Sequence, residues 1–336
     1  MSALPTIAVT VSLLSVTGCG LRAPLPTPLG THVAPPAEGL QLVWSTRGVF
    51  IPSDGAHLRI NATTVFLAGG INGDLRVNLV ALDQTTGTLL WQRDVAPTAL
   101  EVEDAAVYAG SIDAISAYDT QGKVIWSTPL PLTRTVISIS LDKDQLNVLT
   151  ASTELIQIER ATGVMLNREP APGLLARAHG VRYYLPGSIA GLQARTEESG
   201  ILWQTELGAN ASTIAGAIPG TLIVKTGGPA PHAFGLDERT GAIKWGSEQA
   251  LLSNVASGGE FAAYLDTDGH LHIVDANNGE SVASAAFAPG DFPRVDSDLH
   301  PRSYEVAVSL DGAVVVYFGD SMELFAFRIA ASSDAA

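Results

Sequence analysis

Two histidines and three aspartates close together in the chain are the residues with the clearest capacity for chemistry. Asp266, Asp268, His270, His272 and Asp275 lie within ten positions, and imidazole and carboxylate groups are common metal ligands. In an extended strand, residues two apart share a face, which would place the two histidines together. The Asp-x-Asp-Gly order is also that of an ordinary hairpin turn, and no second segment supplies further ligands. We therefore favour the turn and predict no metal and no cofactor.

Other patterns that resemble sites are isolated. Asp142-Lys143-Asp144 lacks the rest of a calcium loop and is interpreted as solvated charge. Asn61 and Asn210 begin glycosylation sequons, which arise often by chance. The sequence has no Ser-His-Asp order, no phosphate-binding glycine loop and no Cys-His zinc spacing. We predict no catalytic residue and no enzyme activity.

The elements that must position these residues belong to a repeated hairpin. In its clearest copy, Ala81 to Trp91, an apolar run reaches an aspartate, turns at a glycine and enters a second apolar run that ends on tryptophan. Such a turn needs positive φ, which glycine adopts without steric cost, and the indole is expected to pack between repeats. The repeated positions are Trp44, Asp83, Gly87, Trp91, Asp119, Gly122, Trp126, Gly163, Gly200, Trp203, Asp237, Gly241, Trp245, Asp275 and Gly279.

The spacing of the repeat predicts the fold class. Its turn glycines are 35, 41, 37, 41 and 38 residues apart, and a period near 40 with several short strands per unit is typical of a radial β-propeller. Counting units gives an all-β, seven-bladed propeller with four-stranded antiparallel blades. Eight blades are the alternative, if residues 288–301 hold a degenerate unit.

The two ends of the chain carry complementary parts of one blade. Residues 41–47 match the second half of the hairpin, with no first half before them, whereas residues 304–309, 313–318 and 324–329 supply only three strands. Pairing the N-terminal strand with the last three would complete a blade and remove two exposed sheet edges. We therefore expect the ring to be closed by this pairing.

Composition limits the partners. Apolar residues make up 46% and charged residues 16%, with a formal net charge of −15. This acidic balance argues against binding to nucleic acid or to anionic lipid headgroups. We expect a monomer whose partners, where they bind by charge, present basic surface.

The N-terminal residues have the pattern of a targeting segment. An apolar run over residues 7–16 leads to Cys19, the only cysteine, and the stretch resembles the lipobox of bacterial lipoproteins, in which that cysteine is lipidated. The expected organisation is a signal peptide (1–18), a proline-rich tether (19–38), a propeller (39–330) and a disordered tail (331–336). Because Gly20 is not the aspartate that retains many lipoproteins at the inner membrane, the resemblance implies an outer-membrane lipoprotein facing the periplasm, with the cell surface as the alternative. The lipid would be its only contact with the membrane.

Units of the form Ala-Leu-Asp-x-x-Thr-Gly-x-x-x-Trp resemble the PQQ-like repeats, as in residues 81–91. A lipoprotein with these repeats and no other domain resembles the BamB lipoproteins. The resemblance implies a non-catalytic scaffold for protein–protein interaction in the bacterial envelope, with the outer-membrane β-barrel assembly machinery among its partners. One alternative is a quinoprotein oxidoreductase with PQQ and calcium, although a single cysteine cannot form the cysteine pair those enzymes often use. Another is a propeller that binds a small ligand or polysaccharide.

Overall fold

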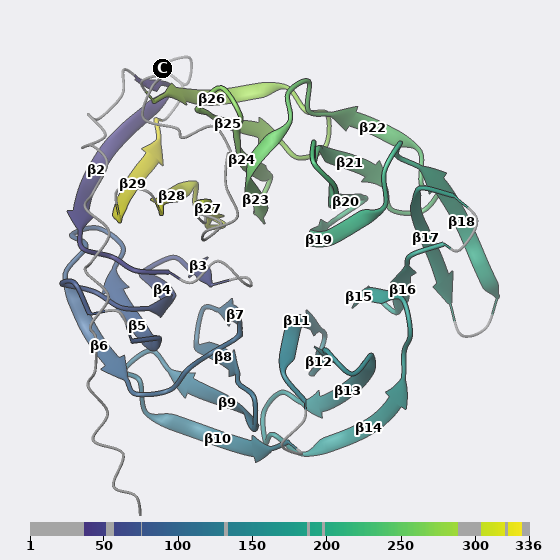
Figure 1. Ribbon diagram of the computed structural model, residues 1–336, viewed down its shortest axis with the longest axis horizontal. Coiled ribbons are helices and arrows are strands. Elements are labelled where there is room, and N and C mark those ends of the chain that lie inside the picture. Colours follow the sequence, from purple (N-terminus) through teal and green to yellow (C-terminus); the bar gives the residue numbers. More distant parts are fainter. Residues whose placement is uncertain are drawn as a thin grey trace, which may run out of the picture.

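The computed structural model describes residues 37–51, 57–74, 76–130, 134–186, 189–196, 199–287, 304–319 and 322–330. Their regular structure is entirely β: strands β1 to β29 form seven sheets arranged in a ring (Figure 1). Within these ranges there is no helix, and so none with the length and apolar character that a bilayer crossing requires. The predicted all-β propeller of seven antiparallel blades is confirmed.

Each sheet is one blade, and its consecutive strands run in chain order from the inside of the ring outward, except that β1 and β2 from the N-terminus lie outermost in the sixth and seventh blades. The first blade comprises β3 (Leu58–Ile60), β4 (Thr64–Gly69), β5 (Asn78–Asp83) and β6 (Leu89–Arg93). The second comprises β7 (Ala99–Glu103), β8 (Ala106–Gly110), β9 (Ala114–Asp119) and β10 (Val124–Pro129). The third comprises β11 (Val136–Asp142), β12 (Gln145–Thr150), β13 (Glu154–Glu159) and β14 (Met165–Pro170).

The remaining blades follow the same order. The fourth comprises β15 (Leu174–Ala178), β16 (Val181–Tyr184), β17 (Gly191–Thr196) and β18 (Gly200–Glu206). The fifth comprises β19 (Ala211–Ile218), β20 (Thr221–Thr226), β21 (Ala233–Asp237) and β22 (Ile243–Gly246). The sixth comprises β23 (Leu251–Gly258), β24 (Phe261–Asp266), β25 (His270–Asp275) and β26 (Ser281–Ala286), with the short β1 (Ala37–Glu38) outside it. The seventh comprises β27 (Tyr304–Val308), β28 (Ala313–Phe318), β29 (Glu323–Ile329) and β2 (Leu40–Arg47).

The ring closes between the two ends of the chain, as predicted. β2 pairs antiparallel with β29, with Leu40 opposite Ile329 and Trp44 opposite Ala326, and in Figure 1 the purple β2 lies along the outside of the yellow β29. A hydrogen-bonded ion pair of 2.6 Å between Arg47 and Glu323 fastens the far end of this ladder. The residues proposed for an eighth blade, 288–301, lie outside the described ranges.

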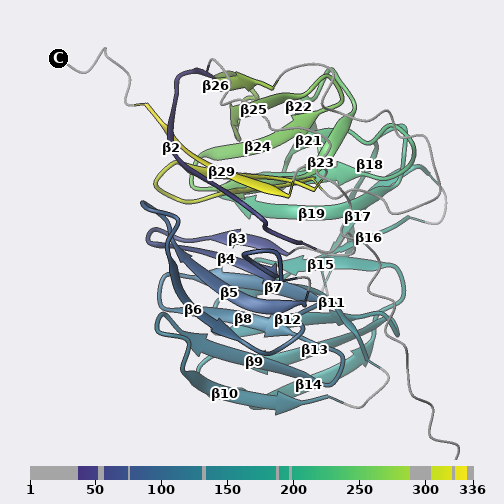
Figure 2. The ribbon, with the colours of Figure 1, turned by 60° about the vertical axis from the view of Figure 1, so that its left-hand side comes forward.

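The core is divided among the seven blade boundaries, each with its own apolar cluster. The cluster between the sixth and seventh blades is rich in phenylalanine, whereas the one between the third and fourth contains four buried residues. Figure 2 shows the sheets of the second and third blades in oblique view, with β10 and β14 outermost.

Because strands alternate in direction, the hairpins that join the first to the second strand of each blade, and the third to the fourth strand of the first six blades, lie at one end of the ring. We call this end the turn face and the opposite end the connection face.

Candidate functional site

Five of the seven blade boundaries carry the same tryptophan contact. An indole on the outermost strand of one blade donates its Nε1–H to a backbone carbonyl in the turn of the next blade, at distances between 2.7 and 2.9 Å. The pairs are Trp44 with Gln84, Trp91 with Thr120, Trp126 with Arg160, Trp203 with Glu238 and Trp245 with Ala276. These residues therefore hold neighbouring blades together.

The turn glycines lie directly under these indoles. Gly122 has φ 74°, and a Cβ built on it would lie 2.6 Å from Cδ2 of Trp91. Four further turn glycines meet the tryptophan of the preceding blade in the same way: Gly87, Gly163, Gly241 and Gly279. The repeat thus needs glycine for its backbone conformation and also for the close approach of the neighbouring indole.

Aspartates fix the shape of the same turns. Asp83 Oδ1 accepts hydrogen bonds from the backbone N–H and the hydroxyl of both Thr85 and Thr86. The hydroxyl of Thr85 and then that of Thr86 are the main reasons that the pKa of Asp83 lies below its usual value. Asp119, Asp237 and Asp275 likewise accept backbone N–H groups of their own turns.

Two boundaries lack the tryptophan. Asn167 stands where the third blade would carry it, and Gly200 in the next blade meets no described atom within 4 Å of a built Cβ. At this boundary between the third and fourth blades, an ion pair of 2.6 Å between Nη2 of Arg182 and Oε1 of Glu169 supplements the small apolar cluster. Ala283 stands at the corresponding place in the sixth blade, and the phenylalanine-rich cluster fills that boundary instead.

A belt of exposed aliphatic side chains follows the outer strands on the side of the turn face. We call it the apolar rim. Its members are 37–57% exposed, and every blade contributes at least one. They are Leu42, Val43, Leu89, Leu90, Val124, Ile125, Val164, Met165, Leu166, Ile201, Leu202, Ile243 and Val282. In Figure 1 the strands that carry them, from β2 and β6 round to β26, form the circumference.

The apolar rim was not predicted from the sequence. Its signal was nevertheless present, because two adjacent apolar residues precede Trp91, Trp126 and Trp203, whereas a half-buried strand alternates apolar with polar residues. A β-bulge falls next to the tryptophan in each of these strands and twists the edge locally.

The rim is hollowed where the ring closes. A depression of about 300 Å³ lies between β2 and the first blade's turn, lined among others by Leu42, Val43 and Gln84. Gln84 is 4% exposed, and the Oε1 and Nε2 of its side chain have no hydrogen-bond partner within the described part of the chain. An unsatisfied buried amide costs about 1–3 kcal/mol, so a ligand that pairs with it gains correspondingly.

The histidine-containing stretch forms the turn favoured from the sequence. Asp266 ends β24, and its Oδ1 accepts the backbone N–H of Asp268 at 2.9 Å and of His270 at 2.8 Å. Its Oδ2 lies 2.7 Å from Nε2 of His272. Burial raises the pKa of Asp266, but the hydrogen bonds from His272 and from the His270 backbone outweigh it and leave that pKa below its usual value. Asp275 takes part in the next turn, beyond the other end of β25.

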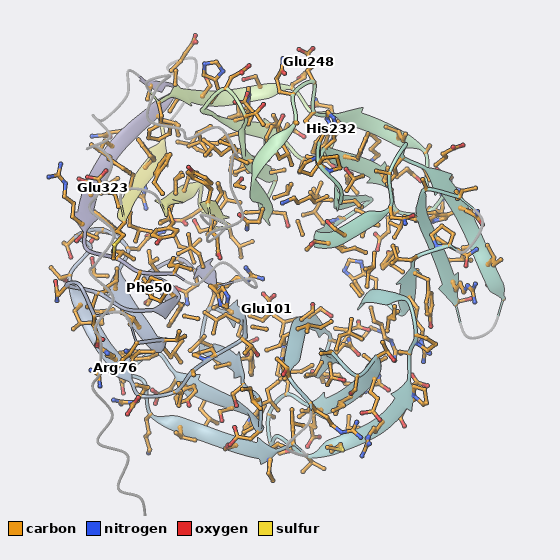
Figure 3. The ribbon with its side chains drawn as sticks, in the orientation of Figure 1. Phe50, Arg76, Glu101, His232, Glu248 and Glu323 are labelled. Carbon is orange, nitrogen blue, oxygen red and sulfur yellow. The ribbon has the colours of Figure 1, made fainter. Side chains whose placement is uncertain are left out.

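Charged groups also gather on the inner strands. Glu305 of β27 is 4% exposed and accepts the backbone N–H of His57 at 3.1 Å. Burial raises the pKa of Glu305 to about 7, although attraction to Arg59 opposes the shift. Nε of Arg59 in turn lies 3.7 Å from Oε2 of Glu101 of β7. Figure 3 places Glu101 at the inner end of the second blade.

The other patterns from the sequence occupy ordinary structural positions. Oδ2 of Asp142 lies 3.8 Å from Nε of Arg177, while the side chain of Asp144 is almost fully exposed. Asn61 is buried, and its Oδ1 accepts the backbone N–H groups of residues 63 and 64, so it shapes a turn. Asn210 is exposed. Cys19, the expected signal peptide, most of the tether and the tail 331–336 lie outside the described residues.

Comparisons with known proteins agree with this fold. The crystal structure of BamB from Moraxella catarrhalis is 14% identical, with 86% of this chain and 99% of that chain covered at a TM-score of 0.50. A chain from the crystal structure of the mitotic checkpoint complex is 13% identical, with 90% and 99% covered at a TM-score of 0.63. No curated protein matches the sequence. At these identities the likeness shows the fold alone.

A family model described as "Outer membrane protein assembly factor BamB" matches residues 74–281. These residues run from the connection between β4 and β5 of the first blade to the start of β26 in the sixth. The match covers more than half of the chain, and the protein therefore belongs to this family of PQQ-like repeat propellers.

Proposed function

We propose that this protein is a non-catalytic scaffold of the bacterial envelope, anchored through a lipid on Cys19, which takes part in the assembly of outer-membrane β-barrel proteins. Family membership supports the assignment to envelope assembly. The observation that carries the scaffold role is the apolar rim together with its hollow at the ring closure.

The rim has the properties of a surface that binds extended polypeptide. Contiguous exposed apolar side chains on a soluble protein mark interaction sites. Among the described residues, no further strand pairs with the outer edge of each blade, which leaves a row of backbone N–H and C=O groups available there. A segment laid along β2 would pair with this edge and cover Leu42 and Val43. Gln84 lines the hollow beside it, and its buried amide would offer two donors and one acceptor to a peptide group once the side chain turns toward the hollow.

Charge selects the partner further. The net charge of −15 disfavours acidic segments and speeds the approach of basic ones. We therefore take the occupant to be an extended segment of an envelope protein, apolar on alternate residues and carrying basic residues, such as a β-strand of a barrel protein or of the assembly machinery.

The test is recovery of partners from living cells by photo-crosslinking. A photoreactive residue at Val43, on the rim, is compared with one at Ile112, which is 54% exposed on the connection face. We expect the Val43 probe to capture barrel-assembly components or barrel proteins and the Ile112 probe to capture far less. A set of Val43 adducts without either class would contradict the proposed function.

Two measurements complete the test. Serine in place of both Leu42 and Val43 should weaken this capture, whereas Ile112→Ser should not, since all three side chains are more than one-third exposed and contribute little to folding. Reduction of a redox dye by the purified protein with PQQ and calcium would instead identify a quinoprotein oxidoreductase.

A further inference from the structure

Two histidines and one carboxylate converge at the connection face of the sixth blade. Along β25, Leu271 and Ile273 face the cluster shared with the seventh blade. His270 and His272 alternate with them and lie on the opposite side of the strand, where Tyr264 of the neighbouring β24 belongs to the cluster shared with the fifth blade. Asp266, at the end of β24, lies against both histidines.

The donor atoms lie near the separations that a small ion requires. Oδ2 of Asp266 lies 2.7 Å from Nε2 of His272 and 3.7 Å from Nδ1 of His270, and all three atoms lie within 4.8 Å of one another. Tetrahedral ligands about 2.0–2.1 Å from zinc are roughly 3.3 Å apart. Shifts of about half an ångström would therefore bring both pairs to coordination geometry.

Two of the three ligands are already held in place. Asp266 has a side chain that is 1% exposed, and its Oδ1 is fixed by two backbone N–H groups, which leaves Oδ2 directed at the histidines. The His272 ring stacks on Tyr264 with centroids 5.1 Å apart and an interplanar angle of 25°. His270 is 48% exposed and can adjust. The turn and the ligand set thus use different oxygens of one carboxylate.

The geometry points to a binding site for one zinc-like transition-metal ion on Asp266, His270 and His272, with a fourth coordination position open to solvent. Two imidazole nitrogens favour Zn²⁺ and similar borderline ions over Ca²⁺ and Mg²⁺, which prefer sets of oxygen ligands. The open position would hold water or a donor group from a bound protein. This site is separate from the apolar rim, which lies on the side of the turn face.

The test is metal binding by the mature chain, purified without a histidine tag. Isothermal titration with ZnCl₂ measures affinity and stoichiometry, and Cu²⁺ electron paramagnetic resonance reports the number of coordinated nitrogens. The variants are His270→Gln, His272→Gln and Asp266→Asn, the last of which keeps an oxygen for the turn. The matched control is His179→Gln, because His179 also lies 2.7 Å from a carboxylate, that of Glu238, but in a pair without a second histidine.

We expect one equivalent of Zn²⁺ bound, hyperfine coupling to two nitrogens, and no displacement by excess Ca²⁺ or Mg²⁺. Affinity should fall about tenfold or more in both histidine variants of the site and stay unchanged in His179→Gln. The proposal is overturned if the natural chain binds no stoichiometric Zn²⁺, or if His270→Gln binds as tightly as the natural chain. Since His270 is half exposed, that variant should fold normally and decides the question even where His272→Gln is unstable.

Discussion

Two turn glycines offer a matched test of the contact between blades. Gly122 lies four residues before Trp126 and Gly200 three residues before Trp203, each at the hairpin between the last two strands of its blade, and their φ values are nearly equal at 74° and 73°. They differ in what lies above them, since a Cβ on Gly122 would meet the Trp91 ring and one on Gly200 meets no described atom within 4 Å. The substitutions Gly122→Ala and Gly200→Ala therefore share the backbone strain and differ in the clash.

The magnitudes follow from these contacts. Alanine in the left-handed region costs about 1–2 kcal/mol at either position. At Gly122 the new Cβ would lie 2.6 Å from Cδ2 of Trp91, so the ring must move by about 1 Å to reach an ordinary contact. Overpacking of this kind costs about 1–3 kcal/mol, and the movement also strains the 2.9 Å hydrogen bond from Trp91 to Thr120. We expect Gly122→Ala to lose about 1–3 kcal/mol more stability than Gly200→Ala.

Urea unfolding followed by tryptophan fluorescence measures the difference. Both variants should give similar m values, so that the shift in midpoint reports stability. The Trp91 fluorescence should also change in the native state of Gly122→Ala alone. Equal losses of stability in the two variants would refute the reasoning that the indole of one blade packs on the turn glycine of the next.

Three further predictions concern the core. Burial raises the pKa of Glu305 to about 7, from an unfolded value near 4.5. Between these two pH values the folded chain keeps a proton that the unfolded chain has lost. The free energy of unfolding should therefore fall by up to about 3 kcal/mol as the pH rises through that window. Glu305→Gln should abolish this component, as urea midpoints at pH 5 and 8 will show, and an unchanged difference between the two pH values would contradict it. Phe287→Ala should destabilise by about 3–5 kcal/mol, since the ring is 1% exposed among three other phenylalanines; a loss below 1 kcal/mol would argue against that packing. In hydrogen exchange, β15 should be the least protected inner strand, because its boundary has the smallest cluster and no tryptophan; protection equal to that of β27 would show otherwise.

The fold could be predicted because its signals are local and periodic. A turn glycine and an indole recur at the length of one blade, and one spare strand at the N-terminus with one missing strand at the C-terminus implies the pairing of β2 with β29. Each of these features can be read from neighbouring residues without knowing the rest of the molecule.

The hollow at the ring closure and the buried charges could not be predicted in the same way, because they depend on contacts between distant segments. Nothing near Glu305 in the sequence indicates that His57, which is 248 positions away, donates to its carboxylate. The hollow lined by both Leu42 and Gln84 forms only when the N-terminal strand packs beside the turn of the first blade. Asp266 was noted from its residue type, but only the hairpin geometry shows that its two oxygens serve different partners.

The closed ring can be tested most directly by a disulfide across its seam. Gln41 and Arg328 are paired in the β2–β29 ladder and are both exposed, and directly opposed residues of antiparallel strands have Cα atoms about 4.5–5.5 Å apart, within disulfide range. In a chain with Cys19→Ser, the pair Gln41→Cys and Arg328→Cys should form an intramolecular disulfide on mild oxidation, whereas Gln41→Cys with Arg168→Cys should not. Failure of the first pair to link, or linkage only between two molecules, would contradict a ring closed by its own N-terminal strand.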